Sequence, residues 1–488
     1  MAWADDEMAG LDLNDKRLRK RAIQVLDGLA QGGESTPDAF RTKATLEGAY
    51  RLMDNDKSTP EALLDPHLLQ TIRRTVQHRR VLLAHDTTEV DVTKPSRQVK
   101  GAGPLAVPTR LGFFLHPLMA FTPEGLPLGL AANLYWRRET VDMVSTRSQK
   151  RKKCRAIPIE KKESYRWVQM TRQGKAIARQ NSETEYVLVS DSESDIYEVF
   201  EETKDRSDNC HLVVRACHDR TILACQDSSP GDVPGTLQTI AQALVASPVS
   251  YKSHIQVRGR SAMTPSEKRQ RRVSREDRTA MVEIRAARVT LRPARREDRT
   301  FAPITLNVVE TREPDPPKGE PPLIWTLITT LSIDDENAIQ QVIESYKIRW
   351  HIEVYFRTLK SGMGLEKLQY QTLERYLNAT ILLMIVAWRV YMLTHLARQA
   401  HDIPCSDYFE DSEWKPALLV SYPGQQLPTQ PPSIKQFLLV VAGLGGYINK
   451  PKQGSPGTTT VWRGIRRVEM LQQAYLAFGS DTRQKCEV

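Results

Sequence analysis

Cysteine is scarce in this chain, and long uninterrupted apolar runs are missing. Six of the 488 residues are cysteine and they form no paired framework, which indicates a reducing compartment and excludes a disulfide-stabilised scaffold. Residues 1–7 are acidic and lack the apolar stretch of a signal peptide. The most apolar segment, residues 377–393, contains Asn378 and Arg389, so we expect a buried core helix. These features favour a soluble cytoplasmic protein that has no membrane partner.

Acidic residues are outnumbered by basic ones. The chain has 69 Lys and Arg residues against 59 Asp and Glu residues, which gives a formal net charge of +10. This excess favours polyanionic partners, although it does not by itself select one function. The basic run 150–153 reads as an exposed loop, whereas the run 268–278 is either a solvated loop or a loop that lies along nucleic acid. The length of the chain allows two to four domains.

Two apolar runs each end at an aspartate. Residues 81–85 are followed by Asp86, and residues 186–190 are followed by Asp191. Continuous apolar runs of this length are typical of strands buried on both faces of a sheet. A carboxylate at the end of such a strand is held rigidly while it faces a cleft, which suits a metal ligand. A single aspartate there is more often a cap or turn residue, and we interpret Asp195 as an acid in the first turn of a helix.

Further strands are expected around these two runs. The apolar segments 111–120 and 126–136 are joined by a Thr-Pro-Glu-Gly turn, which predicts two antiparallel strands. Residues 212–215 and the alternating stretch 280–291 also read as strands. We therefore interpret most of the long interval that follows Asp191 as a β-rich insertion.

One further segment carries four chemically distinct side chains at helical spacing. A carboxylate, two cations and a phenol fall within about 60° of one another at 100° per residue. Such a stripe suits a site that holds a metal ion and a phosphate together. Clustered carboxylates favour Mg²⁺ or Mn²⁺, which prefer oxygen ligands. The four residues are Tyr346, Arg349, Glu353 and Lys360.

The spacing Tyr-x2-Arg-x3-Glu-x6-Lys resembles the signature of the DDE transposases of the bacterial insertion-sequence class, which includes the transposon-five transposase. The resemblance implies that Asp86, Asp191 and Glu353 are the catalytic acids and the metal ligands. It implies Mg²⁺ as the cofactor, with Mn²⁺ able to substitute, in a two-metal site. The implied contacts with DNA at the cleavage site are those of Tyr346, Arg349 and Lys360.

The second aspartate motif departs from the family. Ser192 stands where the family member has Arg, which puts a phosphate contact from that position in doubt. The fold implied by the resemblance is an α/β, RNase-H-like (retroviral-integrase-like) catalytic core that carries a β-rich insertion. We expect a helical DNA-binding domain over 1–69, the catalytic domain over 70–364 with its insertion at about 205–330, and a helical dimerisation domain over 365–488.

The amino-terminal region is expected to bind DNA. Asn14 and Asp15 can cap a helix that has apolar residues at helical spacing and ends at Gly32. Residues 11–18 and 47–51 resemble the family's transposon-end binding domain, although a basic helix face is more often simply solvated. The resemblance implies contacts with DNA by Arg17, Arg21, Arg41, Lys43 and Arg51.

Two residues of the insertion also match the family. The segment 316–325 agrees with a family motif nearly residue for residue and ends in Trp325. A Trp in an apolar run is usually a core residue, but the resemblance implies that Trp325 stacks on a base expelled from the duplex. Arg215 likewise matches a family position that contacts the transposon strand.

The leading hypothesis is a cut-and-paste DNA transposase from the bacterial cytoplasm, associated with the nucleoid. It would bind terminal repeats as a homodimer, nick the DNA, form and reopen a hairpin, and join the element to target DNA. Two alternatives are a metal-dependent nuclease of the same fold and an inactive DNA-binding regulator. A nuclease would need the acidic trio but would give no reason for Tyr346, Arg349 and Trp325. A regulator would tolerate loss of an acid.

Overall fold

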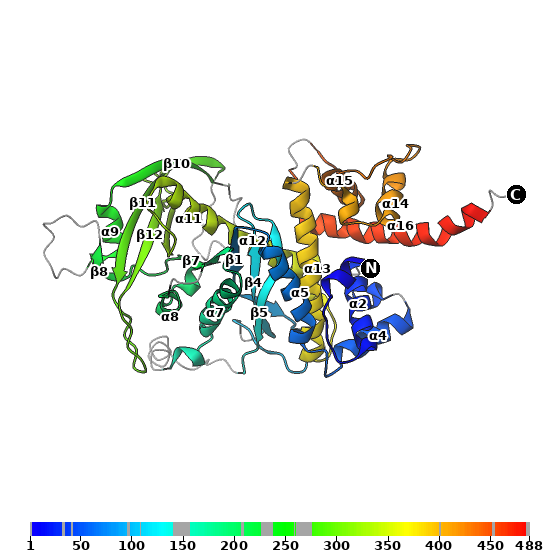
Figure 1. The fold of residues 1–488 in the computed structure, drawn as a ribbon, viewed down its shortest axis with the longest axis horizontal. Helices are drawn as coiled ribbons and strands as arrows, with labels where there is room; N and C mark the ends of the chain where they lie inside the picture. Colours follow the sequence, from blue (N-terminus) through cyan, green and yellow to red (C-terminus); the bar gives the residue numbers. More distant parts are fainter. Residues whose placement is uncertain are drawn as a thin grey trace. The chain divides into compact units, whose positions relative to one another are not determined.

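The computed structural model describes residues 2–31, 35–40, 42–94, 98–107, 109–139, 157–205, 209–225, 238–257, 259, 276–399, 402–450 and 454–484. The chain divides into two compact units, each built from separate segments (Figure 1). Unit 1 comprises Met1–His78, Thr87–Asp142 and Trp350–Val488. Unit 2 comprises Arg79–Asp86 and Met143–Arg349.

Three parallel strands form the first part of the sheet of unit 2. β1 (Arg80–His85) pairs with β6 (Glu185–Ser190), which pairs with β7 (Cys210–Arg215). All but the first residue of β1 and of β6 are buried, as the continuous apolar runs in the sequence predict. The predicted strands that precede the two aspartates are therefore confirmed.

Helices α7 (Tyr165–Gln180) and α11 (Glu336–Ile348) cover opposite faces of these strands. Successive residues of a strand point to opposite faces. At the end of β1 the His85 ring packs against Trp167 of α7, with 5.0 Å between ring centroids. The next residue, Asp86, accepts a hydrogen bond from Arg349 at the end of α11. The helical layers thus lie above and below the strand ends.

The rest of the sheet of unit 2 is antiparallel. β13 (Ile324–Thr329) pairs with β7, and the order continues through β12, β11, β8 and β9, while β10 pairs with β11. This extension, which includes the helix α9, carries the labels β8, β10, β11 and β12 in Figure 1. The predicted strand at 280–291 lies within β11. The bounds are β8 (Thr221–Cys225), β9 (Gln238–Thr239), α9 (Ile240–Ala246), β10 (Val249–Val257), β11 (Arg278–Leu291) and β12 (Ile304–Arg312).

Unit 1 contains the predicted antiparallel hairpin. β4 (Leu111–Phe121) pairs with β5 (Pro127–Trp136), and it also pairs with the short strands β2 (Thr88–Asp91) and β3 (Gly103–Pro104). The β4–β5 turn closes through a bond from Thr122 N to Leu126 O of 3.0 Å. Gly125 has φ +88 in this turn, a conformation that favours glycine.

A long apolar helix forms the core of unit 1. α13 (Leu373–Gln399) is long and apolar enough to cross a membrane by length and composition, but 89% of its most apolar window is buried inside the structure. The predicted core helix is therefore confirmed. Around it lie α1 (Ala2–Glu7), α2 (Lys16–Gln31), α3 (Thr36–Ala39), α4 (Lys43–Met53) and α5 (Pro60–Thr75). The predicted start of α2 is also confirmed, because Asp15 Oδ1 accepts from Arg17 N at 2.8 Å.

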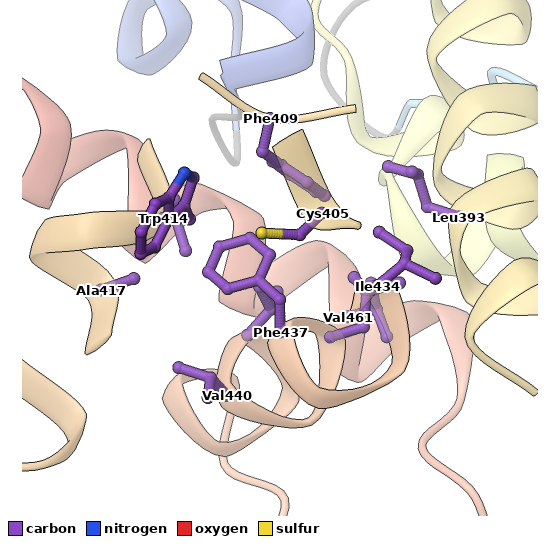
Figure 2. Close-up of a cluster of buried hydrophobic side chains, with 12 residues drawn as sticks. Leu393, Cys405, Phe409, Trp414, Ala417, Ile434, Phe437, Val440 and Val461 are labelled. Carbon is purple, nitrogen blue, oxygen red and sulfur yellow. The ribbon is translucent and has the colours of Figure 1, made fainter. Parts of the chain in front are cut away.

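The carboxy-terminal helices have their own apolar cluster (Figure 2). The helices are α14 (Asp411–Ser421), α15 (Ile434–Leu444) and α16 (Thr458–Gln484). Trp414 and Phe437 are large members of the cluster and are almost fully buried. α15 and α16 approach closely because Gly464 has no side chain: an added Cβ would lie 1.8 Å from Val441 O.

The segment with the Tyr-Arg-Glu-Lys spacing is not one regular helix. α11 ends at Ile348, Arg349 is its C-cap, and α12 (Trp350–Arg357) follows. A π-helical turn over Thr358–Gly362 then carries Lys360. Because a π turn changes the angular spacing, the single-stripe geometry expected over this segment is wrong at Lys360. The boundary between the two units also falls here, directly after Arg349.

Candidate functional site

Asp86 and Asp191 follow neighbouring parallel strands at matching positions. Each lies two residues beyond the paired residues Ala84 and Val189. Adjacent strands are about 4.8 Å apart, so the two carboxylates leave the sheet side by side. Both residues are partly exposed, whereas the strand residues before them are buried. The sheet of unit 2 therefore brings two of the three predicted acids together.

Arg349 forms an ion pair with the first of these acids. Its Nη1 donates to Asp86 Oδ2 at 3.0 Å, and the two side chains are 15% and 18% exposed. The Arg349 guanidinium also lies 6.0 Å from the ring centroid of Tyr346. Burial raises the pKa of the Tyr346 phenol, while the charges of Arg349 and Arg215 oppose the shift, so the phenol is neutral at pH 7.

The turn after β6 holds Asp191 in place. Asp191 Oδ1 accepts a hydrogen bond from Glu193 N at 2.9 Å, and its carbonyl oxygen accepts one from Ser194 Oγ at 2.8 Å. Asp195 has a different role from the one expected: it precedes the N-cap of α8 (Tyr197–Glu201) and binds the β7–β8 loop through Cys217 N. Asp195 is 5% exposed and also pairs with Arg220, so it is a structural residue.

Arg215 and Trp325 lie on neighbouring strands of unit 2. Arg215 ends β7, where it pairs in register with Leu327, and its side chain is exposed. Trp325 is the second residue of β13 and is only partly buried. It is therefore not a core residue, in contrast to Trp167 of the same unit, which is 0% exposed.

Glu353 and Lys360 belong to unit 1. Glu353 is partly exposed on α12. Lys360 is engaged within the unit, because its Nζ donates to Glu89 O at 2.7 Å and lies 2.9 Å from Glu366 Oε1. The third predicted acid and the second predicted cation of the motif are thus in a different unit from Asp86 and Asp191.

The amino-terminal cations lie on two helices of unit 1. Arg17 on α2 is exposed, and Arg21 packs closely over Gly48 of α4, where an added Cβ would lie 1.4 Å from Arg21 Nη1. Lys43 and Arg51 on α4 are 91% and 79% exposed. Arg41 lies outside the described residues, as do the basic run 150–153 and most of the run 268–278.

Asp86 and Asp191, which follow the carboxyl ends of β1 and β6, suit a divalent cation that prefers oxygen ligands, since each offers a carboxylate. Among the residues that the structure describes, no three acidic, histidine or cysteine side chains form a complete metal-binding group. Of the predicted trio, unit 2 carries Asp86 and Asp191, and unit 1 carries Glu353. Asp86 and Asp191 would supply two ligands.

Comparison with known families gives three matches along the chain. Residues 1–58 match the family "Transposase DNA-binding". Residues 171–389 match "Transposase DDE domain", and residues 385–480 match "Transposase Tn5 dimerisation domain". The chain belongs to the Tn5-like DDE transposases. The transposase is thus a DNA-binding protein of a family whose DDE domains use divalent metal ions.

Most, but not all, of the predicted site residues of the transposase fall within a matched segment. Asp191 and Glu353 fall within the matched DDE segment, whereas Asp86 precedes it. The amino-terminal cations fall within the matched DNA-binding segment. Among solved structures, a piggyBac transposase synaptic complex with hairpin DNA is 9% identical over 94% of this chain and 73% of the other, with a TM-score of 0.36.

Proposed function

We propose that this transposase excises its element from DNA and joins it to a target site, with Asp86, Asp191 and Glu353 as the catalytic acids. The observation that carries the proposal is the register match of β1 and β6, which sets Asp86 beside Asp191. The DDE family match, which includes Asp191 and Glu353, supports the same assignment. We further propose an RNase-H-like catalytic core over 70–364, between the DNA-binding domain 1–69 and the dimerisation domain 365–488.

The three acids would hold Mg²⁺, for which Mn²⁺ can substitute. A bound metal pair supplies activation of the attacking oxygen and stabilisation of the leaving oxygen in an in-line displacement. The protein's own side chains would orient the DNA. Arg349 and Arg215 offer guanidinium groups for phosphate oxygens, and the neutral phenol of Tyr346 is a hydrogen-bond donor beside them. Trp325 presents a partly exposed aromatic face for an expelled base.

Four displacements at phosphorus would complete the reaction. Water attacks at the element end and releases a 3′ hydroxyl, which then attacks the opposite strand and closes a hairpin. A second water reopens the hairpin, and the freed 3′ hydroxyl attacks a target phosphate. Each step forms one phosphorus–oxygen bond and breaks another, so a single site that positions the phosphate serves all four.

A labelled duplex that carries candidate terminal repeats tests the proposal. Incubation of the transposase with this duplex and Mg²⁺ should yield a nicked strand, then a hairpin that migrates as a longer single strand under denaturing conditions. A nuclease of the same fold would yield nicks or breaks without the hairpin. Absence of any cleavage with intact end binding would favour a DNA-binding regulator.

Substitution of each acid tests its assignment. Asp86→Asn, Asp191→Asn and Glu353→Gln should each abolish nicking while end binding persists, because a ligand is lost but the basic surface of the amino-terminal helices is not. Nicking and gel-shift affinity are measured on the same preparations. Glu344→Gln, at an exposed acid of α11, is the control and should nick normally. Normal nicking by one of the three variants would remove that residue from the site.

A further inference from the structure

A cation from a different element reaches the turn that carries Asp191. Arg166, the second residue of α7, is 12% exposed at its side chain. Its Nη2 donates to Glu193 Oε2 at 2.5 Å, and its Nη1 donates to Glu163 O at 2.9 Å. The guanidinium lies 5.2 Å from the ring centroid of Trp167. These contacts hold the Arg166 side chain in place.

The partner of Arg166 is itself bound to the catalytic carboxylate. Glu193 N donates to Asp191 Oδ1 at 2.9 Å, while the Glu193 carboxylate, which is 63% exposed, accepts from Arg166. Glu193 thus links Arg166 to Asp191 through its backbone on one side and its side chain on the other. Because the Glu193 carboxylate is exposed, solvent would compete for it if the guanidinium were absent.

The charge of Arg166 interacts with both strand-end acids, Asp86 and Asp191. Burial lowers the pKa of the Arg166 guanidinium, and the charges of Glu193, Glu163, Asp191 and Asp86 oppose the shift. The guanidinium is therefore within electrostatic reach of both strand-end carboxylates. The chain has Ser192, a neutral residue, directly after Asp191, so the motif itself supplies no cation at that position.

We propose that Arg166 is a positioning residue that orients the Asp191 carboxylate for metal binding through Glu193. This inference rests on the proposed function of Asp191 as a metal ligand. Groups that hold a ligand without touching the metal commonly change metal affinity by about 10- to 100-fold when they are removed. The direction of the change in metal affinity distinguishes a positioning role of Arg166 from a purely electrostatic one. Removal of a nearby positive charge alone would strengthen cation binding, whereas loss of the orientation of Asp191 weakens it.

Binding of Mn²⁺ to the full-length transposase, followed by electron paramagnetic resonance of the free ion, separates the two effects. Arg166→Ala should weaken Mn²⁺ binding about tenfold. Glu193→Gln should weaken it by a similar factor, and the double variant should be no weaker than Arg166→Ala, because both substitutions break one link. Arg166→Lys should recover part of the affinity.

A second arginine on the same helix gives a matched control. Arg172 pairs with Glu202 at 2.7 Å and is 50% exposed, and Arg172→Ala removes the same charge from α7 without touching the Asp191 turn. Its Mn²⁺ affinity should equal that of the wild type. Melting temperatures of all variants report folding, and Arg166→Gln, which also removes the positive charge, replaces Arg166→Ala if that variant does not fold.

Unchanged or tighter Mn²⁺ binding by the folded Arg166 and Glu193 variants would overturn the inference. Asp191→Asn separates this failure from failure of the proposed function. Wild-type Mn²⁺ affinity in Asp191→Asn would show that Asp191 is not a ligand, and both proposals would fall. Lost affinity in Asp191→Asn together with normal affinity in the Arg166 and Glu193 variants would overturn the positioning role alone.

Discussion

Arg349 occupies an oxygen of Asp86 that the proposed metal site needs. The guanidinium that donates to Asp86 Oδ2 at 3.0 Å is a positive charge beside the same oxygen, so it opposes the binding of a metal ion there. A DNA phosphate can accept the guanidinium in place of Asp86. Because coupling between two ligands is reciprocal, DNA that captures Arg349 would strengthen metal binding, and metal would strengthen DNA binding.

This competition predicts that Arg349→Gln binds Mn²⁺ more tightly than the wild type when DNA is absent. A pair that contributes on the order of 1 kcal/mol corresponds to roughly fivefold in affinity. Titration with and without end DNA should show strengthening by DNA in the wild type and almost none in the variant. Arg80→Gln is the control, since it breaks the pair with Glu185 at the opposite end of β1. Weaker Mn²⁺ binding by Arg349→Gln would contradict the competition.

The partial exposure of Trp325 gives a prediction about one reaction step. Trp325→Ala should slow hairpin formation about tenfold, since base stacking contributes about 1 to 3 kcal/mol, and should affect first-strand nicking less. Its melting temperature should change little, because the ring is not fully buried. Ile324→Ala, which alters the opposite face of β13, is the control. Equal slowing of both steps with a lowered melting temperature would argue for a structural Trp.

The sequence predicts some of these residues and not others, for a physical reason. Asp86 and Asp191 could be predicted because a buried strand leaves a continuous apolar run before each acid. The ion pair of Arg349 with Asp86 joins residues far apart in the chain, and no local pattern reports it. Arg166 was missed for the same reason, since nothing within α7 indicates that it meets Glu193.

At the scale of elements, α1 is fastened to unit 1 by a buried polar network. Glu7 of α1 accepts from His67 Nδ1 at 2.5 Å and from both terminal nitrogens of Arg74, at 3.0 Å each. Leu130 N of β5 donates to His67 Nε2 at 2.9 Å, so that ring nitrogen is an acceptor and the imidazole is neutral. Three elements, α1, α5 and β5, therefore depend on one tautomer of His67.

This network predicts a loss of stability in mild acid. Burial lowers the pKa of His67 below its usual value near 6.5, so the unfolded chain takes up the proton first as the pH falls. The contribution of neutral His67 to the free energy of unfolding is complete above pH 6.5. Below pH 6.5 it declines, with a limiting slope of about 1.4 kcal/mol per pH unit. His67→Gln should flatten the dependence of the denaturation midpoint between pH 6.5 and 5. His254→Gln, at an exposed position of β10, should retain the wild-type dependence. If His67→Gln kept the wild-type pH dependence of the denaturation midpoint, the His67 network would not be the cause of that dependence.

Element boundaries were less predictable than the elements. Apolar periodicity identified α2, α13 and the β4–β5 hairpin, because each buries one face or all of its surface. The Tyr346–Lys360 segment divides into two helices and a π turn, and a 3.6-residue periodicity does not predict this division. The four residues of the predicted helix face thus lie on α11, its C-cap, α12 and the π turn, and the expected single-stripe spacing is wrong at Lys360.

At the scale of the whole molecule, the end of α16 leaves large apolar side chains in solvent. Met470, Leu476 and Phe478 are 59%, 60% and 74% exposed. They lie within the segment 385–480 that matches the Tn5 dimerisation domain. Isolated exposed apolar residues are common, but several on the last turns of one helix are typical of an interface. The expected dimerisation domain did not identify these particular side chains, because their exposure depends on which faces of α16 are covered by neighbouring helices.

We therefore predict that Leu476→Glu together with Phe478→Glu prevents pairing of two copies. Introducing carboxylates into an apolar interface adds a desolvation cost and mutual repulsion, so the dimer should dissociate in sedimentation experiments while the monomer remains folded. Gel shifts should then show binding of one DNA end only, because the amino-terminal helices are unchanged. Val245→Glu, at a 67% exposed position of α9, adds charge elsewhere and should leave the dimer intact. A stable dimer in the double variant would place the interface on another surface, and hairpin formation by a purely monomeric variant would show that one copy suffices for cleavage.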